Sequence, residues 1–166
     1  MRIASLVVSA LAFGFAGAAS AQSIQPVSYS PDFQEALEDD LGVREGAYLS
    51  ETLSRYVAEA LEARGLSGRE VQIELSIVDA RPNRPTFEQA MDRPGLDIFN
   101  SISVGGAELR GVVRNSAGAE VQTVEHRYYS HDLWHARFNA DTWGDARRAM
   151  RRFATKVADA VATSAS

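Results

Sequence analysis

The fold is decided by the stretch Glu70–Asp79, which reads EVQIELSIVD. Apolar residues stand at every second position of this stretch: Val71, Ile73, Leu75 and Ile77. Because successive side chains of a β-strand point to opposite faces, the alternation predicts a half-buried strand with one face in water. We therefore expect the rest of the chain to cover one face of a sheet only.

Two helical patterns precede this strand. Ser30-Pro31 supplies an N-cap and a first-turn proline for a short helix whose apolar residues recur every four positions up to Gly42. From about Glu45 to Arg64 the apolar residues follow the 3.6-residue period of an α-helix, and Gly65 provides a C-terminal stop. A short strand is expected ahead of both helices, at Gln25–Tyr29.

The clearest helical pattern lies near the carboxyl end of the chain. Its apolar residues form a continuous stripe: Trp143, Ala146, Met150, Phe153, Val157 and Val161. Thr142 and Asp145 resemble a capping box with Asp in place of the usual Glu. We expect a helix from Trp143 to Thr163 that lies across the sheet.

A hairpin is expected between the strand at residues 70–79 and this last helix. Asn115-Ser116-Ala117-Gly118 has Asn at the first and Gly at the fourth place of a type I turn. Pairing Arg114 with Ala119 sets Ala107 opposite His126, which places His126 on the same face as the core residues. The second strand of the hairpin ends near Tyr129.

The first strand of the hairpin carries one irregularity. Its apolar residues occupy even positions at Ile102 and Val104 but odd positions at Ala107 and Leu109. The change falls at Gly105-Gly106, which predicts a glycine β-bulge there.

The order of elements is strand, helix, helix, strand, strand, strand, helix. Consecutive strands tend to pair as hairpins, whereas a strand–helix–strand crossover is parallel and right-handed. The sequence therefore predicts an α+β fold: a four-stranded mixed, largely antiparallel sheet with helices packed on one face. Residues 22–166 form a single domain in this interpretation, a length that supports a substantial core.

Composition excludes several classes of protein. The 166 residues include 17 basic and 22 acidic side chains, a formal net charge of -5, and no cysteine. Disulfide partners, thiolate metal sites, cysteine nucleophiles and lipidation on cysteine are therefore excluded. The negative charge opposes binding to nucleic acid.

The amino terminus has the three parts of a secretory signal peptide. Met1-Arg2 is a short positive start, Ile3–Ala18 is mostly apolar, and Ala19-Ser20-Ala21 is a cleavage triplet before Gln22. A membrane anchor is the alternative, but glycines interrupt the apolar stretch and it ends in a cleavage site. We expect residues 1–21 to be removed and the mature protein to be periplasmic or secreted.

The connection from Asp79 to Asp97 is the leading candidate for a binding site. Long connections in compact domains are often binding elements, and this one contains three prolines. The residues expected to contact a partner are Arg81, Asn83, Arg84, Phe87 and Arg93. Arginine forks onto carboxylate or phosphate, and Phe87 could anchor a partner. Alternatively, Thr86–Met91 forms one helical turn that plugs the end of the sheet.

A second candidate is a metal site. His131 and His135 stand at i and i+4, the spacing that points two imidazoles the same way on a helix. Asp132 would act as the base of a metal-dependent hydrolase, and the third ligand would be His126 or a carboxylate. Against this, the segment lies between a strand and a helix, where the two histidines are ordinary exposed loop residues.

The third candidate is a basic stripe on the last helix, made of Arg147, Arg148, Arg151 and Arg152. A charged stripe is either the solvated face of a helix or a weak contact with an anionic surface, to which each arginine contributes about 1 kcal/mol. An acidic patch early in the chain could pair with it in space: Glu35, Glu38, Asp39 and Asp40.

No catalytic signature is present, and one resemblance guides the interpretation. It rests on the strings Asp79-Ala80-Arg81-Pro82-Asn83-Arg84-Pro85-Thr86-Phe87, Arg93-Pro94-Gly95-Leu96, Gly105-Gly106-Ala107, Trp143-Gly144-Asp145-Ala146 and Arg152-Phe153-Ala154. With these strings the chain resembles a family of small exported bacterial envelope proteins of unknown function. The resemblance implies export and an α+β fold, and it brings no catalytic residues.

The leading hypothesis is therefore a non-enzymatic periplasmic domain without a cofactor. It would bind another envelope protein through the Asp79–Asp97 connection and the adjoining end of the sheet.

Overall fold

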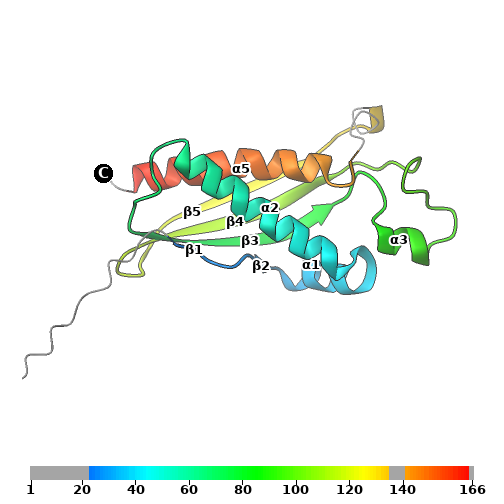
Figure 1. Cartoon of the computed structure of the whole chain (residues 1–166), viewed down its shortest axis with the longest axis horizontal. Helices are drawn as coiled ribbons and strands as arrows, with labels where there is room; N and C mark the ends of the chain where they lie inside the picture. The colour runs from blue at the N-terminus through cyan, green and yellow to red at the C-terminus, as the bar shows by residue number, and fades with distance from the viewer. Residues whose placement is uncertain (1–22, 135–140, 165–166) are drawn as a thin grey trace, which may run out of the picture.

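The protein folds as two layers, a mixed β-sheet and a pair of long helices that cover one of its faces (Figure 1). The computed structural model describes residues 23–134 and 141–164, so the expected signal peptide lies outside the described residues. The elements are β1 (Ser23–Ile24), β2 (Ser28–Tyr29), α1 (Pro31–Ala36), the π-helical turn η1 (Leu37–Leu41), α2 (Val43–Glu62), β3 (Val71–Arg81), α3 (Phe87–Asp92), β4 (Gly106–Asn115), β5 (Glu120–Tyr129) and α5 (Gly144–Thr163).

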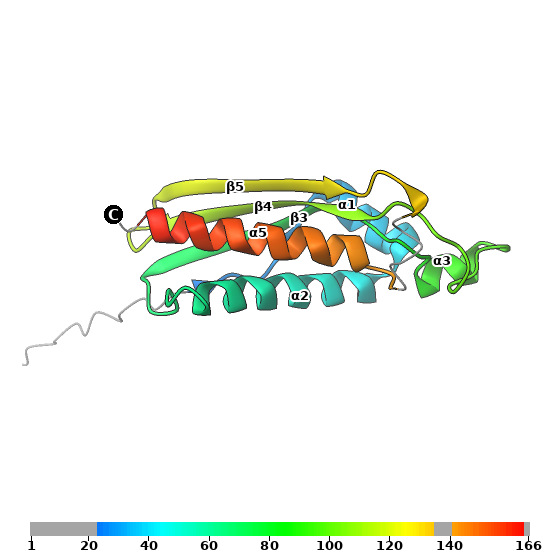
Figure 2. The ribbon, with the colours of Figure 1, turned by 90° about the horizontal axis from the view of Figure 1, so that it is seen from above.

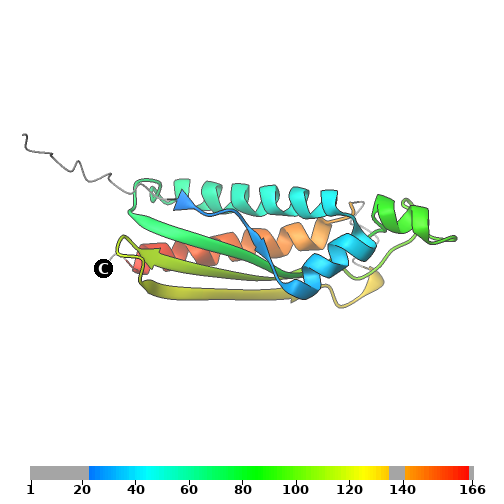
Figure 3. The ribbon, with the colours of Figure 1, turned by 90° about the horizontal axis from the view of Figure 1, so that it is seen from below.

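The sheet has the order β1-β3-β4-β5, with β2 also paired to β3. β1 and β2 run parallel to β3, whereas β3, β4 and β5 form an antiparallel meander. Of the strand expected at Gln25–Tyr29, only Ser28–Tyr29 forms, as β2, and β1 precedes the expected range. Pro26 separates the two strands, because it offers no backbone N–H to the ladder. This edge, continued by α1, faces the viewer in Figure 3. The predicted α+β class, with a mixed and largely antiparallel sheet, is confirmed.

Helices α2 and α5 run side by side along the sheet (Figure 2). Both lie close to their predicted ranges, since the apolar period that marks them is also the face they bury. The largest fully buried side chains come from these helices, from α1 and η1, and from β3 and β4: Trp143, Phe33, Phe153, Leu37, Leu49, Leu53, Leu61, Ile73, Leu75, Ile77, Leu109 and Met150. A Cβ on Gly111 would lie 3.0 Å from the Phe153 ring, so this glycine lets α5 approach the sheet closely.

The opposite face of the sheet carries charged pairs in place of a helix. Arg114 of β4 donates to Glu74 of β3 at 2.7 Å, and this bond lowers the pKa of the Glu74 carboxyl. Arg127 of β5 lies 3.5 Å from Glu108 of β4. The alternation that predicted one wet face is therefore matched by cross-strand ion pairs on that face.

The predicted hairpin register is wrong by two residues. The type I turn is present, with the Gly118 N–H donating to the Asn115 carbonyl at 2.9 Å. A bulge follows it, because Val113 pairs with Gln122 whereas Arg114 pairs with Glu120. A shift of two residues keeps every side chain on its face. His126 therefore still lies on the helix-covered side, as predicted.

In the observed register Leu109 lies opposite His126, and Ala107 lies opposite Tyr128. The position predicted for a β-bulge in the first hairpin strand is wrong. No bulge occurs at Gly105-Gly106, because β4 begins at Gly106 and the preceding residues belong to the connection. The bulge lies in the partner strand β3 instead, between Ile77 and Asp79.

The predicted capping box of the last helix is also wrong. Trp143 occupies the N-cap position of α5 and makes no side-chain capping bond. Asp145 is buried and accepts a hydrogen bond from a residue 62 positions earlier, Asn83. The start of α5 is therefore fixed by a tertiary contact.

Candidate functional site

The connection between β3 and β4 closes over a cavity of about 420 Å³ at the end of β3. Its walls are mostly apolar, and they include Leu41 of η1, Ala80 of β3, and Leu96 and Ile102 of the connection. We call the surrounding part of the molecule, residues 82–104 with Val43, Leu133 and Trp134, the loop end.

Asn83 fixes the connection to the core. Its side-chain Nδ2 donates to Asp145 Oδ2 at 2.6 Å, and its Oδ1 accepts from the Asp145 N–H at 2.9 Å. Its backbone N–H donates to the Thr142 carbonyl at 2.7 Å, and its carbonyl accepts from the Ser103 N–H at 2.9 Å. One residue thus ties both arms of the connection to the first turn of α5.

Asn83 is consequently wrong as a partner contact. Its exposed fraction is 0%, so no partner can touch its side chain. Gly105 packs directly against it, because a Cβ there would lie 2.6 Å from Asn83 Oδ1. The signal that could have located this role is the presence of an amide in a proline-rich segment, since a buried polar side chain must find partners.

Asp40 of η1 holds the α3 segment from the other side. Gln89 Nε2 donates to Asp40 Oδ2 at 2.7 Å, and Arg93 donates to Asp40 Oδ1. Thr86 and Gln89 complete a capping box at the start of α3. The predicted contact residue Arg93 is therefore engaged within the molecule.

The alternative of a helical turn that plugs the sheet end is half right. A helix forms, but none of its residues is buried. Phe87 and Met91 are each 69% exposed, so the apolar side of α3 points outward. The turn packs through its polar capping residues, which leaves Phe87 free to meet a partner.

Asp79, Arg81 and Tyr129 form a polar cluster at one wall of the cavity. The Tyr129 hydroxyl donates to Asp79 Oδ2 at 2.6 Å, and Arg81 Nε donates to the same oxygen at 3.2 Å. Burial, followed by the bond to Asp79, raises the pKa of the Tyr129 hydroxyl. Arg81 also lies over the Tyr129 ring, 5.1 Å from its centroid, and remains largely exposed.

Arg84 shapes the tip of the connection. Its Nη1 donates to the backbone carbonyl of Phe99. Its Nε is buried and has no hydrogen-bond partner among the residues that the structure describes. Of the five predicted contact residues, three arginines therefore serve intramolecular bonds, Asn83 is buried, and Phe87 is open to solvent.

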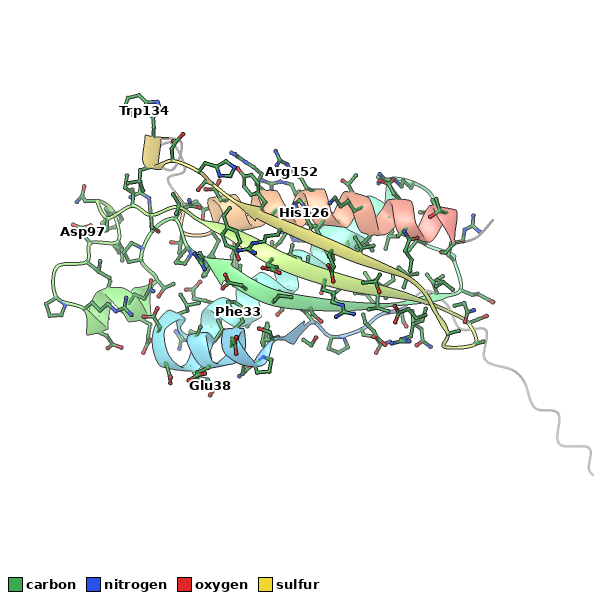
Figure 4. The ribbon with its side chains drawn as sticks, turned by 180° about the vertical axis from the view of Figure 1, so that it is seen from behind. Phe33, Glu38, Asp97, His126, Trp134 and Arg152 are labelled. Carbon is green, nitrogen blue, oxygen red and sulfur yellow. The ribbon has the colours of Figure 1, made fainter. Side chains whose placement is uncertain are left out.

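Large exposed apolar side chains concentrate at the loop end. Ten such side chains occur in the described part of the chain, and eight belong to this end: Val43, Phe87, Met91, Ile98, Phe99, Val104, Leu133 and Trp134. Phe99 is 76% exposed, and Trp134 projects away from the molecule in Figure 4. Sequence reasoning missed Phe99 and Trp134, although aromatic residues outside any periodic pattern were a usable signal.

Only one of the two predicted metal ligands lies among the described residues. His131 is exposed after β5, and His135 lies outside the described residues. His126 points to α5, where Lys156 Nζ lies 3.3 Å from its Nδ1. Within residues 23–134 and 141–164, no group of three or more His, Cys, Asp or Glu residues is placed to hold a metal ion.

The basic stripe of α5 divides into two rows. Arg147 donates to the Tyr48 hydroxyl at 2.9 Å, and Arg151 donates to the Tyr56 hydroxyl at 2.7 Å, both on α2. Arg148 and Arg152 lie on the other side of α5, where both contact Tyr128 of β5. The acidic patch does not pair with either row, because Glu38 and Arg152 lie at opposite edges of the sheet (Figure 4).

No protein family model matches the chain, and no curated protein matches it. The resemblance to exported envelope proteins therefore stays a prediction. Across the described residues, the structure contains no helix long and apolar enough to cross a membrane.

Among solved structures, the chain is similar to the crystal structure of a "putative lipoprotein" from Caulobacter crescentus. The two share 19% sequence identity over 84% of this chain and 88% of that chain, with a TM-score of 0.38.

Proposed function

We propose that the protein is a non-enzymatic domain of the bacterial cell envelope that binds another envelope protein through the loop end. The main support for this proposal is the concentration of exposed apolar side chains around the connection between β3 and β4. The envelope location rests on the expected signal peptide of residues 1–21 and on the family resemblance.

The residue types at the loop end suit a protein interface. Exposed apolar patches rimmed by polar residues mark interaction sites, and aromatic residues and Met are enriched there. Phe87, Met91, Leu96 and Phe99 line one shallow depression, and Leu133 and Trp134 border the next. A partner that covers both would remove several aromatic rings from water at once.

The contacts described above add a second argument. Arg84 binds the carbonyl of Phe99, Asn83 ties both arms of the connection to the start of α5, and Asp40 binds the α3 segment between them. Side chains held in this way lose less conformational entropy on binding than those of a free loop. The segment is thus preorganised to present its apolar residues.

The charges nearby indicate what the partner carries. Exposed carboxylates lie among these apolar residues in the loop end: Glu88, Asp92 and Asp97. The two arginines of the loop end, Arg93 and Arg84, bind Asp40 and the Phe99 carbonyl. We therefore expect a partner segment that combines apolar side chains with Lys or Arg, because an anionic bilayer would be repelled here.

Photocrosslinking in intact cells tests the proposal. A photoreactive amino acid replaces Phe87 or Phe99, and the control position is Val121, an exposed apolar residue of β5. We expect one adduct of defined mass at Phe87 and Phe99 and none at Val121. A Met91→Ser change should weaken the adduct while leaving the melting temperature unchanged, because Met91 is exposed.

Three results would overturn the proposal. They are adducts that form equally at Val121, an adduct with the mass of two copies of this chain, and adducts to lipid alone. The last two would assign the apolar surface to self-association or to a membrane.

A further inference from the structure

Three cationic side chains follow one another along the side of α5 that faces β5. Arg148, Arg152 and Lys156 stand at i, i+4 and i+8, where neighbouring Cβ atoms are about 6 Å apart. Arg148 Nη1 lies 3.4 Å from the Tyr128 hydroxyl, and the Arg152 guanidinium carbon lies 4.9 Å from the centroid of the Tyr128 ring. Lys156 Nζ lies 3.3 Å from His126 Nδ1. We call Arg148, Arg152 and Lys156 the cation row.

Few carboxylates lie near the cation row. Glu125 of β5 and Asp159 of α5 border a depression that Lys156 also lines, but the ion pair of Asp159 is with Arg64. Arg148 has a carboxylate oxygen at 3.9 Å, Asp145 Oδ1, but Asp145 is buried and its other oxygen is bound by Asn83. The described residues show no ion pair of Arg152 or Lys156. The chain has 22 acidic and 17 basic side chains, so an uncompensated row runs against its composition. Adjacent like charges on a helix repel each other, and bound anions remove that repulsion.

His126 borders the row and carries an unused donor. Burial, followed by the charges of Lys156 and Arg152, lowers the pKa of the His126 imidazole. Its Nδ1 faces the Lys156 ammonium, and its Nε2 is buried without a hydrogen-bond partner among the described residues. From β4, the residue opposite is the uncharged Leu109. Figure 4 shows His126 and Arg152 at the same edge of the molecule.

We propose that the cation row, with the Tyr128 hydroxyl as a further donor, binds a phosphate group. Arginine offers a planar fork of donors that matches phosphate oxygens, and lysine adds a point charge. A phosphate monoester carries up to two negative charges, which suits a row of three cations. Arg147 and Arg151 take no part, since their guanidinium groups point to the tyrosines of α2.

NMR titration of the histidines tests the site in the mature protein. Inorganic phosphate is the probe, and sodium chloride of equal ionic strength is the reference. A bound anion favours the imidazolium, so phosphate should raise the pKa of His126 above its value in chloride. His131, which is exposed and lies outside the row, should respond equally to both salts.

Matched double variants separate a site from general charge. Arg152→Gln with Lys156→Gln should abolish the phosphate-specific rise. Arg55→Gln with Arg151→Gln removes the same charge beside Tyr56 and should leave the rise intact. An equal response in both double variants, or no difference between phosphate and chloride in the unmodified protein, overturns the proposal.

Co-sedimentation with vesicles identifies the source of the phosphate. Vesicles of phosphatidylglycerol are compared with vesicles of phosphatidylcholine at physiological salt. Binding to the anionic vesicles that is lost in Arg152→Gln with Lys156→Gln assigns the site to a lipid headgroup. A response to inorganic phosphate without vesicle binding assigns it to a soluble phosphate compound.

Discussion

Phenylalanine is buried in the core but exposed at the loop end. Phe153 of α5 is 0% exposed and packs against β4 at Gly111, whereas Phe99 in the connection is 76% exposed. The core is assembled from side chains that recur with the period of their own helix or strand. The loop end is assembled by polar tethers, Asn83 and Asp40, that leave its apolar side chains outside. The side chains that stabilise the fold and those that we propose for recognition therefore lie in different parts of the molecule.

The largest effect that this comparison predicts comes from the two phenylalanines. Phe153→Ala should lower the free energy of unfolding by about 4 kcal/mol, because it removes a buried ring and leaves a cavity. Phe99→Ala, the matched change at the loop end, should alter it by less than about 0.5 kcal/mol. Urea denaturation of both variants measures the two values. A comparable loss for Phe99→Ala would mean that the loop end contributes to the core.

A smaller effect is expected at the tether between the two regions. Asn83→Ala removes the amide that binds Asp145 and leaves a buried carboxylate with one donor fewer. We expect a loss of about 3 kcal/mol in the free energy of unfolding.

The matched control is Asn100→Ala. The Asn100 side chain donates to the exposed Asp97 of the same connection, so its removal should cost less than about 0.5 kcal/mol. If the two asparagine variants unfold at the same urea concentration, Asn83 does not serve as a tether.

Helices and strands with a periodic apolar pattern could be predicted from the sequence, because the pattern lies within the residues of the element itself. The alternation at residues 70–79 located β3, and the apolar stripe located α5 to within one residue of its start. Both patterns depend only on which face of a single element is buried. The fold class followed from the order of these elements.

The hairpin register could not be predicted with the same rule. Two residues shift the register: Arg114 pairs with Glu120 in place of Ala119, and the bulge at Val121 adds one more residue to β5. Nothing in the alternation of that strand marks either change. The predicted side of the sheet was still correct for His126, because a shift of two residues equals the side-chain period of a strand.

The candidate site was predicted in part. The connection was singled out by its length, prolines and arginines, and Phe87 is exposed there. The role of Asn83 was missed because its partner, Asp145, lies 62 residues away and no local pattern joins them. Lys156 was missed as a member of the basic surface. Its grouping with Arg148 and Arg152 depends on which side of α5 faces β5, and the sequence of α5 alone does not show this.

The smallest predicted effect lies at the border of the core, at His126. Because burial and the cations of α5 lower its pKa, the unfolded chain takes up a proton at a higher pH than the folded protein does. Stability should therefore decrease as the pH falls through the ordinary histidine pKa of about 6.5, down to the pKa of folded His126. Melting temperatures in chloride buffers between about pH 7.5 and pH 5.5 measure this slope. His126→Gln should flatten it slightly, because the imidazole is only partly buried, whereas His131→Gln should leave it unchanged. An identical slope in both variants would mean that His126 titrates as an exposed histidine does, and that it does not belong to the border of the core.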